Sequence, residues 1–252
     1  MGMLGADWFT KLLNGNSNNT NNTNPNMKYS SHVVSDSLLN VKFGIEENYI
    51  LKTNAYQDAK LVWTIGIGTV DVFDDKLNFV LKVYKGLTLA RLKAVMAKTH
   101  LTDLQFCFNL MRNHVRRSKS YQVFKELDGF NIPYNANLAD AIIDFNYNSG
   151  SAYGTTSYYA FIQTLRQNAS MPNNNAQKMA VAYVRYRLAY LESWSPKIYG
   201  SWIRRIQIFA DRIGKNDLSM DNKKSWKIFP TSVSVKTYVQ NTYGYILKKP
   251  LG

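Results

Sequence analysis

The sequence predicts an α+β fold in which a small antiparallel β-sheet lobe is followed by a bundle of helices. Between residues 49 and 83, glycines and β-branched residues gather in VWTIGIGTVDVF and NFVLKV, which is typical of two or three short strands. From residue 86 to residue 213, apolar residues recur at helical spacing behind polar capping residues. Strands that precede a run of helices indicate an α+β arrangement rather than alternating α/β units.

Each helix is predicted from a capping residue followed by an apolar pattern. The first is expected in SDSLLNVKFGIEEN, where Ser35 or Asp36 can cap the N-terminus. The last strong helix is expected over residues 199–213, in YGSWIRRIQIFADRI. Between them, helices are expected to open at five further caps: Thr88, Thr102, Asn137, Thr155 or Thr156, and Asn175.

The composition along the chain predicts four segments. Residues 1–14 can form a short amphipathic helix, and residues 15–30 form an Asn-rich flexible linker that cannot bury a core. Residues 31–216 form the compact domain, and residues 217–252 form a C-terminal extension of unknown role. A small helix on a tether is a docking or anchoring element, or a tail with incidental hydrophobic residues, and the sequence leaves both open.

The charge of the chain indicates an anionic partner. The 252 residues carry a formal net charge of +14, which suits nucleic acid, a membrane surface or an acidic wall polymer, or otherwise a basic solvated surface. The basic clusters RNHVRRSK and RYR are candidates for such a surface. No nucleic-acid-binding motif is present, so nucleic acid is not expected as a partner.

Several other classes are excluded by residue counts. The single cysteine, Cys107, excludes an internal disulfide framework, and three scattered histidines give no metal-binding pattern. We therefore expect neither a metal nor a cofactor. No stretch approaches the ~20 apolar residues of a transmembrane helix, and the N-terminus lacks the features of a signal peptide.

One constellation can carry chemistry. Glu47 ends the first expected helix, and Asp58 and Thr64 follow in the strand region. A hairpin that folds back beside a helix end can place two carboxylates across a groove, as glycoside hydrolysis requires for its acid and its base or nucleophile. A threonine hydroxyl nearby can orient the attacking water. With 17 acidic residues in the chain, two carboxylates this close are also common by accident.

The segment EENYILKTNAYQDAKLVWTIGIGT resembles the catalytic segment of the phage-type lysozymes, the family of the T-even phage lysozyme. The later blocks ADAIIDFNYNSG, SAYGTTSYYAFIQTLRQ and GSWIRRIQIF resemble the family's following helices, so the resemblance runs from about residue 35 to about residue 213. This chain departs from the family in two respects. Two additional residues separate Glu47 from Asp58, and Thr69 stands where the family often has histidine.

The resemblance implies a lysozyme-like fold and a muramidase that cleaves the β-1,4 bond between N-acetylmuramic acid and N-acetylglucosamine in peptidoglycan. It implies that Glu47 is the general acid, that Asp58 is the base or an electrostatic stabiliser, and that Thr64 holds the attacking water. Asn148 would lie along the sugar-binding cleft. Among the aromatic residues, Trp63, Tyr49 and Tyr153 are the candidates for that cleft.

The identity of the acid and the stereochemistry stay open at this point. The stretch YRLAYLESWSPKIYGSWIRRI also resembles a neighbouring muramidase family with an E-G-G-Y motif, in which Glu46 would be the acid. Both assignments give the same class of chemistry. The family resemblance favours inversion at the anomeric carbon, but a sequence gives no carboxyl separation.

Two functions of different classes follow. The first is an endolysin-like or virion-associated muramidase that acts on peptidoglycan glycan strands, with residues 1–30 attaching it to a virion or tail protein. Such a protein would reside in the phage virion, or in the host cytoplasm before release, and act on the wall. The second is a lysozyme-like domain without activity that binds the wall or builds the virion.

Overall fold

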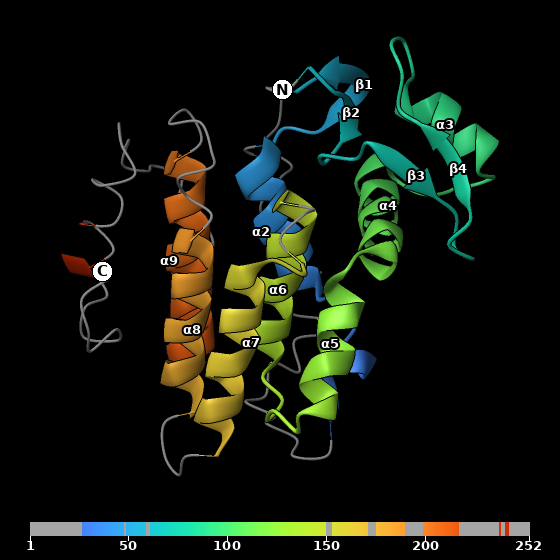
Figure 1. Cartoon of the computed structure of the whole chain (residues 1–252). Helices are drawn as coiled ribbons and strands as arrows, with labels where there is room; N and C mark the ends of the chain where they lie inside the picture. The colour runs from blue at the N-terminus through green and yellow to red at the C-terminus, as the bar shows by residue number, and fades with distance from the viewer. Residues whose placement is uncertain are drawn as a thin grey trace.

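The computed structural model describes residues 27–47, 49–58, 61–149, 153–170, 175–189 and 199–216, together with residues 237, 240 and 241. The expected helix of residues 1–14, most of the linker and almost all of the C-terminal extension lie outside the described residues. The fold is α+β, as the sequence predicts. In Figure 1 the labelled strands gather at one end of the molecule, and most of the helices run away from them.

The strands form two small antiparallel sheets. Strand β1 (Lys52–Gln57) pairs with β2 (Trp63–Gly66), and β3 (Asp71–Phe73) pairs with β4 (Phe79–Lys82). In the first pair Tyr56 lies opposite Thr64 and Gln57 opposite Trp63. This register puts Asp58 directly at the end of β1, beside the start of β2.

The helices are α2 (Asp36–Glu47), α3 (Leu89–Val95), α4 (Asp103–Arg117), α5 (Ser120–Gly129), α6 (Ala136–Ser149), α7 (Thr156–Ala169), α8 (Asn175–Ala189) and α9 (Tyr199–Lys215), preceded by a short 3-10 helix, η1 (Tyr29–Ser31). Most of them build a second lobe around a shared apolar core, whereas α3 contacts β1 and lies beside the strands in Figure 1. Helix α8 packs against both α7 and α9, and α6 contacts α2, α5, α8 and α9. Figure 1 shows α4 beside the strands, above α5.

The expected caps explain most helix starts. The Ser35 hydroxyl accepts a hydrogen bond from the backbone N–H of Leu38 at 3.0 Å, Thr102 makes a reciprocal capping box with Gln105, and Thr155 caps α7. The expected cap of α6 was wrong by two positions. Asn135 caps that helix instead, and its side-chain oxygen accepts a hydrogen bond from the backbone N–H of Leu138 at 3.0 Å.

Two features were not expected from the sequence. Helix α5 was not predicted, and among the described residues it starts after Lys119 with no side-chain cap, so the usual start signal is missing. Packing also begins at Tyr29, inside the stretch assigned to the linker. Tyr29 is fully buried, its N–H donates to Asp128 at 2.7 Å, and its hydroxyl donates to the carbonyl of Pro133 at 2.6 Å.

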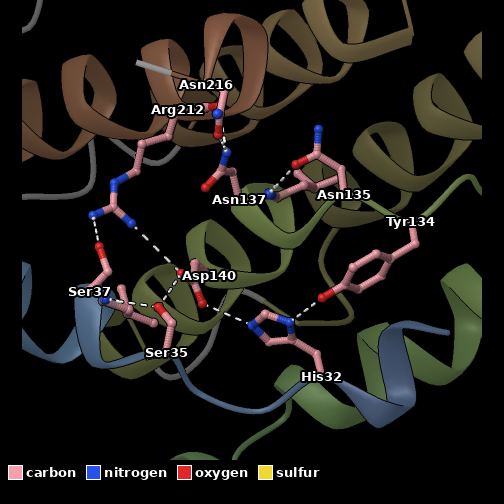
Figure 2. Close-up of polar contacts among 11 residues, drawn as sticks. His32, Ser35, Ser37, Tyr134, Asn135, Asn137, Asp140, Arg212 and Asn216 are labelled. Atoms are coloured by element: carbon pink, nitrogen blue, oxygen red, sulfur yellow. Dashed lines mark hydrogen bonds and ion pairs between the residues drawn. The ribbon is translucent and has the colours of Figure 1, made fainter. Parts of the chain in front are cut away.

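A buried polar network fixes the start of α2 against α6 and α9. Figure 2 shows the His32 imidazole between Tyr134 and Asp140, with Nδ1 2.5 Å from the Tyr134 hydroxyl and Nε2 2.9 Å from Asp140. The Ser35 hydroxyl donates to Asp140 at 2.7 Å, and Arg212 lies 3.7 Å from the same carboxylate. Buried polar groups are tolerated when they are hydrogen-bonded in this way. The network therefore sets where α2 begins, and so where its far end at Glu47 lies.

No helix in the described ranges is long and apolar enough to cross a membrane.

Candidate active site

The β1–β2 hairpin holds Asp58 and Thr64 on one shared residue, Val62. The N–H of Val62 donates to the Asp58 carboxylate at 2.9 Å, and the N–H of Asp58 donates to the Val62 carbonyl at 3.0 Å. The Thr64 hydroxyl donates to the same carbonyl at 3.0 Å. Asp58 is half-buried, whereas Thr64 is only 2% exposed. The hairpin backbone therefore fixes the carboxylate and the hydroxyl relative to each other.

This geometry decides which hydrogen bonds Thr64 can still make. A hydroxyl has one proton to donate and two lone pairs that accept. Because the proton of Thr64 is directed to the Val62 carbonyl, its remaining capacity is to accept. A water that donates one O–H to Thr64 keeps its own lone pairs available for attack on an electrophile.

The end of α2 carries the two candidate acids. The helix ends at Glu47, but the side chains of Glu46 and Glu47 lie outside the described part of the structure, so the choice between them stays a prediction. The chain then turns at Tyr49, which has a left-handed φ of 61° and donates its N–H to the Phe43 carbonyl at 3.3 Å. A Cβ added at Gly44 would lie 2.6 Å from the Tyr49 ring, so only glycine lets this ring lie against the helix end.

The glycines of TIGIG seat the hairpin on the helical lobe. Gly66 has φ +64°, and a Cβ there would lie 2.5 Å from the sulfur of Cys107 on α4. Gly68 has φ +72° and faces the Tyr147 hydroxyl, which donates to the Ile67 carbonyl at 2.9 Å. Both positions have the left-handed φ that favours glycine, and at Gly66 the approach of α4 also leaves no room for a side chain. The string thus brings the strand region against α4 and α6.

Tyr147 joins four elements at this contact. Besides the turn after β2, its ring lies 4.1 Å from the Lys42 ammonium of α2 and 5.0 Å from the His114 ring of α4. Burial lowers the pKa of His114, although the neighbouring Asp71 opposes this, so His114 is neutral at pH 7. Tyr147 was not singled out from the sequence, because a tyrosine on a helix is usually part of the core.

A fully buried ion cluster joins α2 to α6, α8 and α9. The Asp144 carboxylate of α6 meets Lys42 at 3.1 Å, Arg187 at 3.0 Å, and Arg205, and all four side chains are 0% exposed. Burial by itself raises the pKa of Asp144, but the three cations together lower it to about 2. The interpretation of RYR as a surface cluster was wrong for Arg187, because it pairs with Asp144 in the interior, while Arg185 is exposed.

The predicted sugar-contacting residues lie in different places. Trp63 is half-buried on β2, in the same hairpin as Asp58 and Thr64. Asn148 lies near the end of α6, directly after Tyr147, and its buried side-chain oxygen has no hydrogen-bond partner among the described residues. Tyr153 instead faces α5. Its hydroxyl donates to Glu126 at 2.8 Å, and this hydrogen bond raises the pKa of Tyr153 to about 12.

These features define a class of protein. A glycine-rich hairpin that presents a carboxylate and a hydroxyl, seated on a helical lobe beside the end of an acidic helix, is the arrangement of a lysozyme-like α+β protein. The sequence model of the phage lysozyme family matches residues 49–184, which is more than half of the chain. The chain therefore belongs to the phage lysozyme family. No curated protein matches the chain at a significant level.

Family membership points to a muramidase-type hydrolase of peptidoglycan, encoded by phage and lytic toward the cell wall. The matched stretch includes Asp58, Thr64 and Asn148, whereas Glu47 lies just before its start. The family match therefore covers the hairpin and α6, and the choice of acid rests on the sequence pattern alone.

Proposed function

We propose that the protein is a lysozyme that hydrolyses the β-1,4 bond between N-acetylmuramic acid and N-acetylglucosamine by general acid/base catalysis. The observation that carries the proposal is the hairpin, where Val62 anchors both the Asp58 carboxylate and the Thr64 hydroxyl. Membership of the phage lysozyme family agrees with it.

Each group has a defined task in the proposed reaction. Glu47 protonates the glycosidic oxygen as the sugar bond breaks, so that the leaving group departs as a neutral alcohol. A water donates one O–H to Thr64, and Asp58 accepts a proton from that water or stabilises the positive charge that develops on the sugar. Attack by this water on the face opposite the leaving group inverts the anomeric carbon, which requires carboxyl groups roughly 6.5–9.5 Å apart.

The substrate would lie across the hairpin and the end of α6. Asn148 fits this role because its buried carbonyl oxygen can accept a hydrogen bond from a sugar hydroxyl or amide, and none of the described residues supplies one. Trp63 and Tyr49 flank the hairpin and the helix end and would contact the sugar rings. Tyr153, which is tied to Glu126, would contribute at the edge of the cleft.

The proposal is tested by muropeptide release from purified peptidoglycan. We expect the wild type to release muropeptides, and Glu47→Gln and Asp58→Asn to lose about 10²–10⁴-fold in rate, the usual contribution of general acid/base groups. Glu46→Gln is the matched control, since it removes the same charge from the adjacent residue. Loss in Glu46→Gln with full activity in Glu47→Gln would assign the acid to Glu46. The anomer first detected by NMR distinguishes inversion from retention.

A wall-binding or structural protein without activity is the second candidate. The low exposure of Thr64 favours it, because a residue 2% exposed has little surface with which to hold a substrate water. A wild type that binds peptidoglycan but releases no muropeptides would establish this function and overturn the first.

We also propose that residues 1–30 attach the protein to a virion or tail protein, and that it is held in the virion or in the host cytoplasm before it reaches the wall. The test is whether a chain without residues 1–26 is still incorporated into purified virions. Equal incorporation of both forms would contradict this attachment.

A further inference from the structure

A pocket lies away from the hairpin. It encloses about 470 Å³ between α4, the turn that joins β3 to β4, the segment before α2, and the start of α5. One face of α4 supplies most of its polar lining, at positions spaced by three or four residues, namely Asn109, Arg112, Asn113 and Arg116. None of its lining residues belongs to the β1–β2 hairpin or to the end of α2.

The walls of this pocket are held in place by partly buried hydrogen bonds. Asn113 is 5% exposed, and its amide donates to the Phe73 carbonyl and to Asp75, both at 3.1 Å. On the opposite wall, the Tyr121 hydroxyl donates to the His32 carbonyl at 2.9 Å. His32 is itself fixed by the network that Figure 2 shows. The polar groups around the pocket are therefore already positioned before a ligand arrives.

Among the described residues, Arg116 differs from the other charges around the pocket because it forms no ion pair within 4 Å, although its charge helps to lower the pKa of Asp75. Asp75 is engaged by Lys98 at 2.5 Å and by Asn113, and these hydrogen bonds lower the pKa of Asp75. Asp36 pairs with Arg112. Arg116 is exposed, and its one hydrogen bond within the described ranges is a 3.4 Å contact with the Asp75 carbonyl.

We propose that this pocket binds a compact oxyanion, a carboxylate or phosphate group, with Arg116 as its main partner and Arg112 beside it. A guanidinium presents paired N–H donors that match two oxygens of either group. The Asn109 amide adds a further donor on the same face of α4. Asp75 is the carboxylate that lines the pocket, and it does not repel the ligand strongly because Lys98 already pairs with it.

The source of this oxyanion follows if the proposed function holds. Peptidoglycan carries carboxylates on its peptides, and wall polymers attached to it carry phosphates. A binding site separate from the hairpin would keep the protein on the wall between cleavage events, because a second attachment point raises the local concentration of substrate.

The first experiment measures binding of small anions to the full-length protein. Inorganic phosphate and sodium acetate are titrated separately at constant ionic strength, and NMR shifts of Asn109, Asn113 and Tyr121 are followed. We expect saturable shifts in the wild type, and at least about tenfold weaker binding in Arg116→Gln, because a charge-assisted contact is lost. The control is Arg117→Gln, which removes the same charge from the next residue, outside the pocket and over the Phe73 ring.

The outcomes are distinct. Shifts that never saturate, or that are equal in Arg116→Gln and Arg117→Gln, mean general charge screening and overturn the site. A response to phosphate alone or acetate alone identifies the oxyanion. Because this titration contains no glycan, it succeeds or fails independently of muramidase activity.

The second experiment tests the wall as the source. Both variants are sedimented with purified peptidoglycan, with and without its covalently attached phosphate polymer. Weaker retention of Arg116→Gln on bare peptidoglycan assigns peptide carboxylates, and weaker retention only on the polymer-bearing wall assigns phosphate. Equal retention of the two variants on both materials overturns the wall as the source. Muropeptide release by the same two variants shows whether the proposed active site at the hairpin is still active.

Discussion

The β1–β2 hairpin and the interior beneath α6 hold a carboxylate in opposite ways. Asp58 is half-buried, and its carboxylate accepts a 2.9 Å hydrogen bond from Val62 in its own turn. Asp144 is fully buried, and cations from α2, α8 and α9 converge on it. One carboxylate is held by its local turn, and the other joins elements that are far apart in the sequence.

This difference separates a carboxylate proposed to take part in the reaction, Asp58, from one that stabilises the fold, Asp144. A carboxylate with a pKa of about 2 stays ionised at neutral pH and exchanges no protons there, so Asp144 cannot serve as a general acid or base. Strongly shifted pKa values are often taken as a sign of an active site, but ion clusters that support the fold produce them too. In this protein the strongly lowered pKa of Asp144 marks a cluster that supports α2, and the proposed chemistry lies on the β1–β2 hairpin.

The largest expected effect comes from removing the carboxylate of the interior cluster. Asp144→Asn leaves three buried cations without their shared anion and should lower the free energy of unfolding by about 3–5 kcal/mol. Denaturant unfolding measures this change. The control is Asp103→Asn, which breaks a pair with Lys93 whose carboxylate is 40% exposed, and should cost at most about 1 kcal/mol. Equal losses in both variants would show that the cluster does not support the fold.

The second effect concerns how the hairpin is seated. Gly66→Ala places a methyl group 2.5 Å from the Cys107 sulfur at a left-handed φ, and should cost about 2–4 kcal/mol through strain and overpacking. Gly86→Ala is the matched control, because Gly86 also has a positive φ but no atom lies within 4 Å of its added Cβ. The difference between the two variants isolates the contact with α4. A difference near zero would mean that the hairpin and α4 adjust freely.

The third effect is on the pH dependence of stability. The pKa of Asp144 is about 2 in the folded protein and 3.8 in the reference state, so its stabilisation is complete above about pH 4 and is lost as the pH falls toward 2. Thermal unfolding between pH 2 and pH 7 measures this loss. Asp75→Asn is the control. The pKa of Asp75 is also lowered, by hydrogen bonds from Lys98 and Asn113. That carboxylate is 56% exposed, however, so its ion pair with Lys98 is screened by solvent. An unchanged unfolding temperature down to pH 2 would contradict the assignment.

The sequence predicted the features that depend on neighbouring residues. Ser35, Thr102 and Thr155 act within three residues of their own positions, so their caps could be recognised directly. The glycines of TIGIG likewise supply the positive φ values that the turn after β2 needs. Helix α5 was missed because no such local signal precedes it.

The buried cluster could not be predicted, for a physical reason. Charged residues are almost never fully buried unless they are paired, so Arg187 in RYR was assigned to the surface. Its partner Asp144 lies 43 residues away, and Lys42 and Arg205 meet the same carboxylate across separations of 102 and 61 residues. Only the assembled helices bring these groups together.

The smallest expected change in stability comes from the residue with the largest proposed effect on activity. Asp58→Asn keeps a side-chain oxygen that can accept from the Val62 N–H, so the hairpin should keep its fold and the free energy of unfolding should change by less than about 1 kcal/mol. Muropeptide release should nevertheless fall by about 10²–10⁴-fold. Unfolding and activity are measured on the same preparation. A large loss of stability would mean that Asp58 supports the hairpin as Asp144 supports α2, and the separation of chemistry from support would then fail at the residue on which it depends most.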